Sequence, residues 1–101
     1  MPKDIEEKVT CRTPAAPGVT NIPAWKFDLL RETILKVLGT AGPEGMLNKD
    51  LLAAVGAEIS AADLARLGKL GWHVVTVKLE LEVRGEVVRL PVKGPMRIAL
   101  G

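Results

Sequence analysis

The sequence predicts one small α+β domain that is mostly helical, with an extended arm before the helices and a two-stranded hairpin after them. Three observations lead to this fold class. Apolar residues recur at helical spacing from residue 27 to residue 59. Segment 72–85 is the longest apolar-rich stretch and ends in a glycine. Beyond it, two apolar runs flank the turn 91–95, whose two prolines and one glycine are typical of a hairpin.

The chain of 101 residues is long enough for one domain with a core of ordinary size, and we divide it into an arm, 1–22, and a domain, 23–101. No apolar run approaches the roughly 20 residues that cross a bilayer, and residues 1–9 lack the apolar stretch of a secretion signal. Cys11 is the only cysteine and cannot form an intramolecular disulfide, which fits a reducing compartment. We therefore expect a cytoplasmic protein that does not enter membranes.

The arm combines a strand-like stretch with a loop. Val9, Cys11 and Thr13 alternate with polar residues, which is the period of a strand. Residues 14–23 hold three prolines and are predicted to form a loop. Because the arm carries side chains that favour burial, such as Ile22, we expect it to lie on the domain.

The first helix is predicted to begin near Pro23, with Asn21 as its cap, and to end at Gly39, where a positive φ costs little. The loop 39–45 lacks the Gly-Lys-Ser/Thr of a phosphate-binding loop, so we expect no nucleotide site there. Five apolar residues at helical spacing form the inner face of this helix: Phe27, Leu30, Ile34, Leu35 and Leu38.

Two shorter helices follow the first. Residues 46–47 are predicted to be a short extended piece, and Asn48 is predicted to cap a helix over 49–58. Ser60 and the aspartate three residues later resemble a capping box, which predicts a third helix over 61–67.

Segment 72–85 can be read as a strand or as a helix. From Val77 to Arg84, apolar and charged residues alternate strictly, which favours a half-buried strand. A helix places residues about 100° apart and gives two opposed apolar stripes. The helices before this segment and the hairpin after it favour the helix. The first stripe then holds Val74, Val77 and Leu81, the second stripe Trp72, Val75, Leu79 and Val83, and one flank between them His73, Thr76, Glu80 and Arg84.

Residues 81–85, Leu-Glu-Val-Arg-Gly, with a valine soon after, resemble the end of the recognition helix in winged helix-turn-helix proteins. In those proteins a wing of two short strands follows the helix. The resemblance implies a helix over 72–84 and wing strands over 86–90 and 96–100. The predicted fold is therefore a winged helix-turn-helix domain with a C-terminal two-stranded wing and an N-terminal extended arm.

Motifs at residues 11–14, 66–72, 76–82, 85–86 and 94–97 also resemble those of a family of small bacterial proteins that have a winged-helix-like domain and no settled function. The resemblance covers nearly the whole chain. It implies the fold but no activity, because the family itself has none assigned.

Motifs for catalysis or metal binding are absent from the sequence. One histidine and one cysteine cannot supply a His/Cys zinc site. Cys11 and His73 could pair as a nucleophile and its base, but we favour a half-buried thiol and a surface imidazole. We therefore expect a protein that is not an enzyme and that binds no cofactor and no metal.

Charge and fold favour binding to double-stranded DNA, as in a transcriptional regulator. Residues 1–63 carry seven Lys/Arg and nine Asp/Glu, a net charge of −2, whereas residues 64–101 carry seven and three, a net charge of +4. If the first stripe faces the core, His73, Thr76 and Glu80 face outward, where Glu80 would repel phosphate. The predicted DNA contacts are Lys69, His73, Thr76 and Arg84 around the helix, and Arg89, Lys93 and Arg97 in the wing.

The alternative is a protein-interaction or dimerisation scaffold built on the same domain. The second stripe, Trp72, Val75, Leu79 and Val83, favours burial, because each such side chain contributes roughly 1.5–3 kcal/mol when it leaves water. The arm could cover the stripe within one chain, or a second copy could cover it in a homodimer. The helix would then bind protein and would not read DNA.

Overall fold

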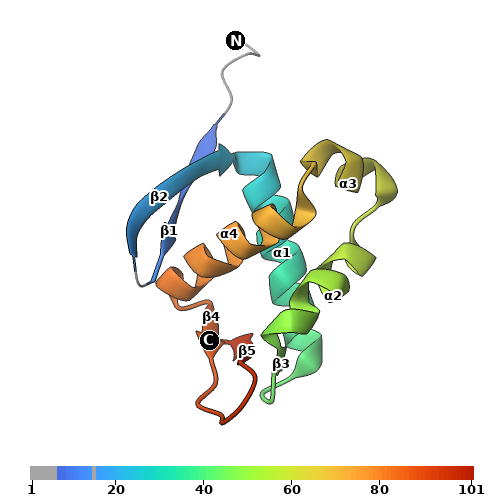
Figure 1. The fold of residues 1–101 in the computed structure, drawn as a ribbon. Helices are drawn as coiled ribbons and strands as arrows, with labels where there is room; N and C mark the ends of the chain where they lie inside the picture. Colours follow the sequence, from blue (N-terminus) through green and yellow to red (C-terminus); the bar gives the residue numbers. More distant parts are fainter. Residues whose placement is uncertain (1–6, 15) are drawn as a thin grey trace.

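The computed structural model describes residues 7–14 and 16–101 (Figure 1). These residues form an N-terminal hairpin, four α-helices and a three-stranded sheet, so the predicted α+β class is confirmed. Residues 1–6 of the predicted arm lie outside the described residues. Within the described part, no helix is both long and apolar enough to cross a membrane.

The N-terminal hairpin consists of β1 (Lys8–Thr13) and β2 (Ala16–Pro23), which pair antiparallel. The predicted alternation is confirmed in β1, where Cys11 is buried in the core. The loop predicted over 14–23 is wrong, because most of it is β2. Pro17 is tolerated there because it falls at the register shift next to Thr13, where the strand needs no ladder donor.

Helix α1 (Ala24–Ala41) begins directly after Pro23, as predicted, but Asn21 does not cap it. The Asn21 side chain instead accepts a hydrogen bond from the Thr10 hydroxyl across the hairpin (2.7 Å). The helix continues through Gly39 and ends at Gly42, whose φ of 78° suits glycine. Its buried face contains the predicted residues except Leu35, which is partly buried, and adds Thr33 and Val37.

Two predicted short helices follow the extended piece β3 (Met46–Leu47). The first begins as a single turn of 3₁₀-helix, η1 (Asn48–Asp50), and continues as α2 (Leu51–Glu58). Asn48 does not cap it through its side chain; its backbone N–H donates to the Met96 carbonyl (2.8 Å). The second, α3 (Ala61–Leu67), has the predicted bounds.

The cap predicted for α3 is present. The Ser60 hydroxyl accepts a hydrogen bond from the Asp63 N–H (3.2 Å), which satisfies one of the unpaired donors in the first helical turn. Helix α3 then ends at Gly68, whose φ is 82°.

The ambiguous segment is helix α4 (Leu70–Arg84), so the helical interpretation is confirmed and the strand is excluded. Val74, Val77 and Leu81 are buried, as predicted for the first stripe, and α4 packs on α1 through this side. The helix ends at Gly85 in the left-handed region, with a φ of 79°.

The sheet contains β3, β4 (Val87–Arg89) and β5 (Arg97–Leu100), in the order β3-β5-β4 with antiparallel pairing. The strand pair predicted after α4 is thereby confirmed, with slightly shorter strands. Position 45, just before β3, requires glycine. Its φ is 64°, and a Cβ there would overlap the carbonyl of Ile98.

Candidate interaction surface

Helix α4 lies between two flanking structures (Figure 1). The hairpin packs along one flank, mainly through β1, while α2 packs on the other. The described chain therefore encloses α4 on three sides, namely by α1, the hairpin and α2. The side that stays accessible carries the second stripe.

The hairpin is attached to α4 by a buried carboxylate. Glu80 is 0% exposed and accepts three hydrogen bonds from Arg12: from the backbone N–H (2.8 Å), Nε (3.0 Å) and Nη2 (2.7 Å). It accepts a fourth from Arg84 Nε (2.7 Å). We call these three residues the hairpin cluster. The Arg12 guanidinium, helped by Arg84 and opposed by burial, lowers the pKa of Glu80 to about 2.

The expectation that His73 and Glu80 face outward is wrong, because the hairpin covers this flank. His73 is 8% exposed, and its Nδ1 lies 2.7 Å from the Lys69 carbonyl oxygen. Burial, the largest cause, raises the pKa of the Cys11 thiol to about 11. A thiol with this pKa is protonated at neutral pH and is a poor nucleophile.

The opposite flank carries a second set of charges. Lys78 Nζ lies 2.6 Å from Glu82 Oε2, and Arg89 Nε lies 2.6 Å from Glu82 Oε1. The Lys78 and Glu82 side chains are only 6% and 7% exposed. We call these three residues the wing cluster. The alternation of apolar and charged residues along α4 therefore does not mark a water-facing side, because Lys78 and Glu80 are buried, Glu82 is partly buried, and all three are paired.

Five of the seven predicted DNA contacts, Thr76 included, are bonded within the chain. His73 and the cluster residues Arg84 and Arg89 are described above, and Arg97 donates to the carbonyl oxygens of Glu44 (3.2 Å) and Gly45 (3.3 Å). Arg84 also lies over the Phe27 ring, with its guanidinium carbon 4.7 Å from the ring centroid.

The remaining two predicted contacts and Thr76 are dispersed. Lys69 is exposed before the start of α4, and Lys93 is exposed in the loop between β4 and β5, beyond the other end of the helix. Thr76 is partly buried, and its hydroxyl donates to the Trp72 carbonyl (2.8 Å). The predicted contacts therefore do not gather on one basic surface.

The second stripe stays accessible along one side of α4. Trp72 is 48% exposed and Val75 is 54% exposed, while Leu79 and Val83 are partly buried. The hairpin holds the neighbouring flank and leaves the start of the stripe open. The described part of the arm therefore does not cover Trp72 and Val75.

A hollow of about 280 Å³ adjoins the stripe, between η1, α2 and α4. Exposed Leu52 and Val75 lie at the hollow, and buried Leu51 and Val74 line it as well. Sequence reasoning did not find this hollow, since it depends on how α2 and α4 pack. The remaining lining residues are Asn48, Gly71 and Lys78.

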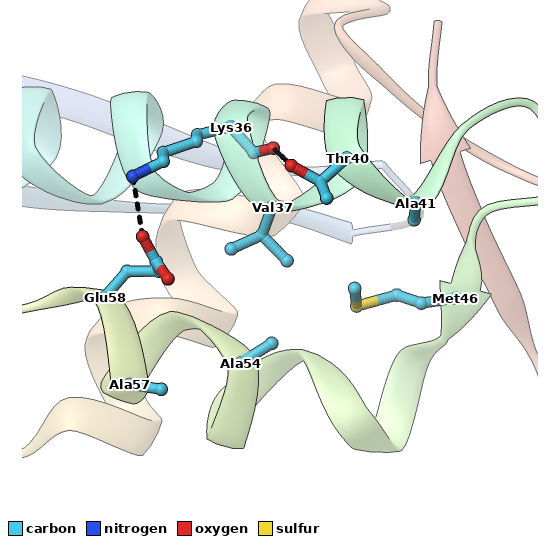
Figure 2. Close-up of a pocket in the computed structure, with 8 residues that line it drawn as sticks. All are labelled: Lys36, Val37, Thr40, Ala41, Met46, Ala54, Ala57 and Glu58. Carbon is cyan, nitrogen blue, oxygen red and sulfur yellow. Dashed lines mark hydrogen bonds and ion pairs between the residues drawn. The ribbon is translucent and has the colours of Figure 1, made fainter.

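A second cleft, of about 370 Å³, lies between α1, β3 and α2. Figure 2 shows Val37, Met46 and Ala54 pointing into it, and an ion pair between Lys36 and Glu58 (2.7 Å) at one end. The alanines of α2 are too small to fill the space beside α1. The two opposite charges compensate each other, so this cleft offers little preference for a charged ligand.

No curated protein and no solved structure is detectably similar to the chain. A family model described as a family of unknown function, DUF6958, matches residues 8–98. This match runs from β1 into β5 and so includes both the hairpin and the helices. It confirms the prediction of an uncharacterised family. The chain therefore belongs to the DUF6958 family, whose function is unknown.

Proposed function

We propose that the protein is a non-catalytic protein-interaction module built on a winged-helix domain, and that the second stripe of α4 is its binding face. One observation carries this proposal. Trp72 and Val75 are about half exposed on a helix whose other sides are packed. Exposed apolar side chains that lie together favour a protein partner, and tryptophan is a frequent anchor of such interfaces.

The order of the elements supports the winged-helix part of the proposal. Strand β3 lies between α1 and α2, and the pair β4–β5 directly follows α4. The sheet order β3-β5-β4 joins the early strand to the late pair. In this interpretation α2 and α4 are the helix pair, α3 lies in their connection, and β4–β5 is the wing.

The charges on α4 argue for protein and against DNA as the partner. Proteins bind DNA largely through Lys and Arg on phosphates. Helix α4 has two such residues: the Lys78 side chain is only 6% exposed, and Arg84 is paired with Glu80 of the same helix. The accessible residues, Trp72 and Val75, cannot bind phosphate.

Substitution on the stripe tests the proposal. Val75→Asp places a charge in its centre, and Val92→Asp is the matched control on another exposed valine, in the loop between β4 and β5. Proteins captured by the wild type should be lost with Val75→Asp and kept with Val92→Asp, provided that circular dichroism shows both variants folded. Sedimentation velocity reports whether the partner is a second copy. If Val75→Asp leaves both the capture of proteins and the self-association of the chain unchanged, the proposal is overturned.

DNA binding remains the second candidate, because the strand order suits a winged helix and residues 64–101 carry a net charge of +4. Its test is retention of a mixed-sequence duplex at low salt, with affinity that falls steeply as salt rises. The triple change Arg89→Ala, Lys93→Ala and Arg97→Ala should then abolish binding. Failure to retain duplex DNA at low salt would exclude this candidate.

A further inference from the structure

The hollow beside the second stripe has apolar walls and a polar end. Leu52 and Val75 are exposed at it, and Val74 lies buried in its lining. Asn48 and Lys78 supply its polar side chains. Small and partly apolar hollows of this kind, with few polar groups, are typical of sites that receive one anchor of a partner.

The charge at the polar end is not balanced. The wing cluster has two cations, Lys78 and Arg89, on the single carboxylate of Glu82. The Lys78 side chain is 6% exposed, so its positive charge has little access to water. A buried charge is stable only when it is paired and hydrogen-bonded. Of the two cations, Arg89 is 48% exposed to water and Lys78 lines the hollow, so the net charge of +1 favours an anion beside Lys78.

The ammonium of Lys78 also has unused donor capacity. An ammonium carries three N–H donors. Lys78 lies within ion-pair distance of Glu82 Oε2, yet that oxygen accepts no well-aligned hydrogen bond among the described residues. A carboxylate in the hollow could accept a hydrogen bond from Lys78, and Asn48 could donate another from its amide.

We infer that the hollow and the second stripe together bind an acidic amphipathic segment of a partner protein. Apolar side chains of the segment cover Trp72, Val75 and Leu52, and one of its Asp or Glu carboxylates pairs with Lys78 beside Asn48. A protein segment fits better than a small free anion, because the apolar surface continues from the hollow onto α4. This inference rests on the proposed function and adds the charge of the partner.

A random 12-residue peptide library, selected on the folded chain, tests the inference. Peptides that require Val75 should be rich in Asp and Glu between apolar residues. A selected peptide whose acidic residue is changed to the amide should bind about tenfold more weakly, as expected for a lost charged hydrogen bond. Lys78→Gln should remove this tenfold preference, whereas Lys36→Gln, which removes a cation at the other cleft, should keep it.

The possible failures are distinguishable. Peptides that require Val75 but show no acidic preference would overturn the inference and leave the proposed function standing. Selected peptides that bind equally to wild type and Val75→Asp would overturn both. If Lys78→Gln does not fold, Leu52→Glu serves instead, because it places a negative charge at the hollow without touching the wing cluster. It should weaken the acidic peptide more than its amide form.

Discussion

The two flanks of α4 hold the same charges in different surroundings. The hairpin cluster and the wing cluster each contain two cations and one buried carboxylate. In the hairpin cluster the cations reach water, since the side chains of Arg12 and Arg84 are 52% and 37% exposed. In the wing cluster Arg89 also reaches water, with 48% of its side chain exposed, but Lys78 is buried beside a hollow. One flank is thus a completed contact within the chain, and the other retains a positive charge that a partner could use.

The largest expected effect is the loss of the carboxylate in the hairpin cluster. Glu80→Ala removes four hydrogen bonds to a charged group and leaves the Arg12 N–H unpaired. We expect the free energy of unfolding to fall by about 3 kcal/mol in urea denaturation. The control Glu58→Ala breaks an exposed pair with Lys36 and should cost less than about 1 kcal/mol. Equal losses in the two variants would contradict the central role of Glu80.

Acid should lower the free energy of unfolding through the carboxylate of the hairpin cluster. The pKa of Glu80 is lowered in the folded chain from its usual 4.5 to about 2, so its contribution is present above pH 4.5 and is lost as the pH falls toward 2. Glu86, whose pKa Arg31 also lowers, contributes in the same direction. The free energy of unfolding, measured from pH 6 to pH 2, should fall less steeply in Glu80→Gln than in the wild type. Parallel curves would contradict this assignment.

The wing cluster should respond differently to loss of a charge. Lys78→Met replaces a buried cation by an apolar side chain of similar length, and Glu82 keeps its pair with Arg89. The cost stays small because Arg89 still pairs with Glu82, so no buried charge is left without a partner. We expect the free energy of unfolding to change by less than about 1 kcal/mol or to rise, as measured in urea. If the free energy of unfolding falls as much as in Glu80→Ala, the two clusters contribute equally to stability.

The smallest effect on stability is expected on the second stripe. Val75 is more than half exposed, so Val75→Asp should change the free energy of unfolding by only about 0.5 kcal/mol. The same variant should lose partner binding. The two measurements together show whether Val75 serves binding or stability. A severe loss of stability would mean that Val75 supports the fold.

Local signals in the sequence predicted most of the helices. Ser60 identified the start of α3 because a cap acts within one turn, and the glycine after Arg84 marked the end of α4 for the same reason. The hairpin was missed because β2 depends on pairing with β1, which in turn packs against α4. The three prolines of residues 14–23 predict a loop locally, but the pairing and packing of the hairpin override this signal.

The candidate site was predicted only in part. The second stripe follows from helical periodicity alone, so Trp72 and Val75 could be named in advance. The orientation of Glu80 could not, because its burial depends on Arg12, 68 positions away. The hollow depends on the distance between two helices, which no pattern within one helix encodes.

The contact between Arg12 and Glu80 also has a consequence for synthesis of the chain. Because the two residues are 68 positions apart, the hairpin leaves the ribosome well before α4 exists. At about 5–20 residues per second, the interval is roughly 3 to 14 seconds. During that time Cys11 and Ile22, which the finished fold buries, have no helix α4 beside them. The nascent chain therefore exposes its first apolar strands for seconds, and this is when a chaperone would have the most to bind.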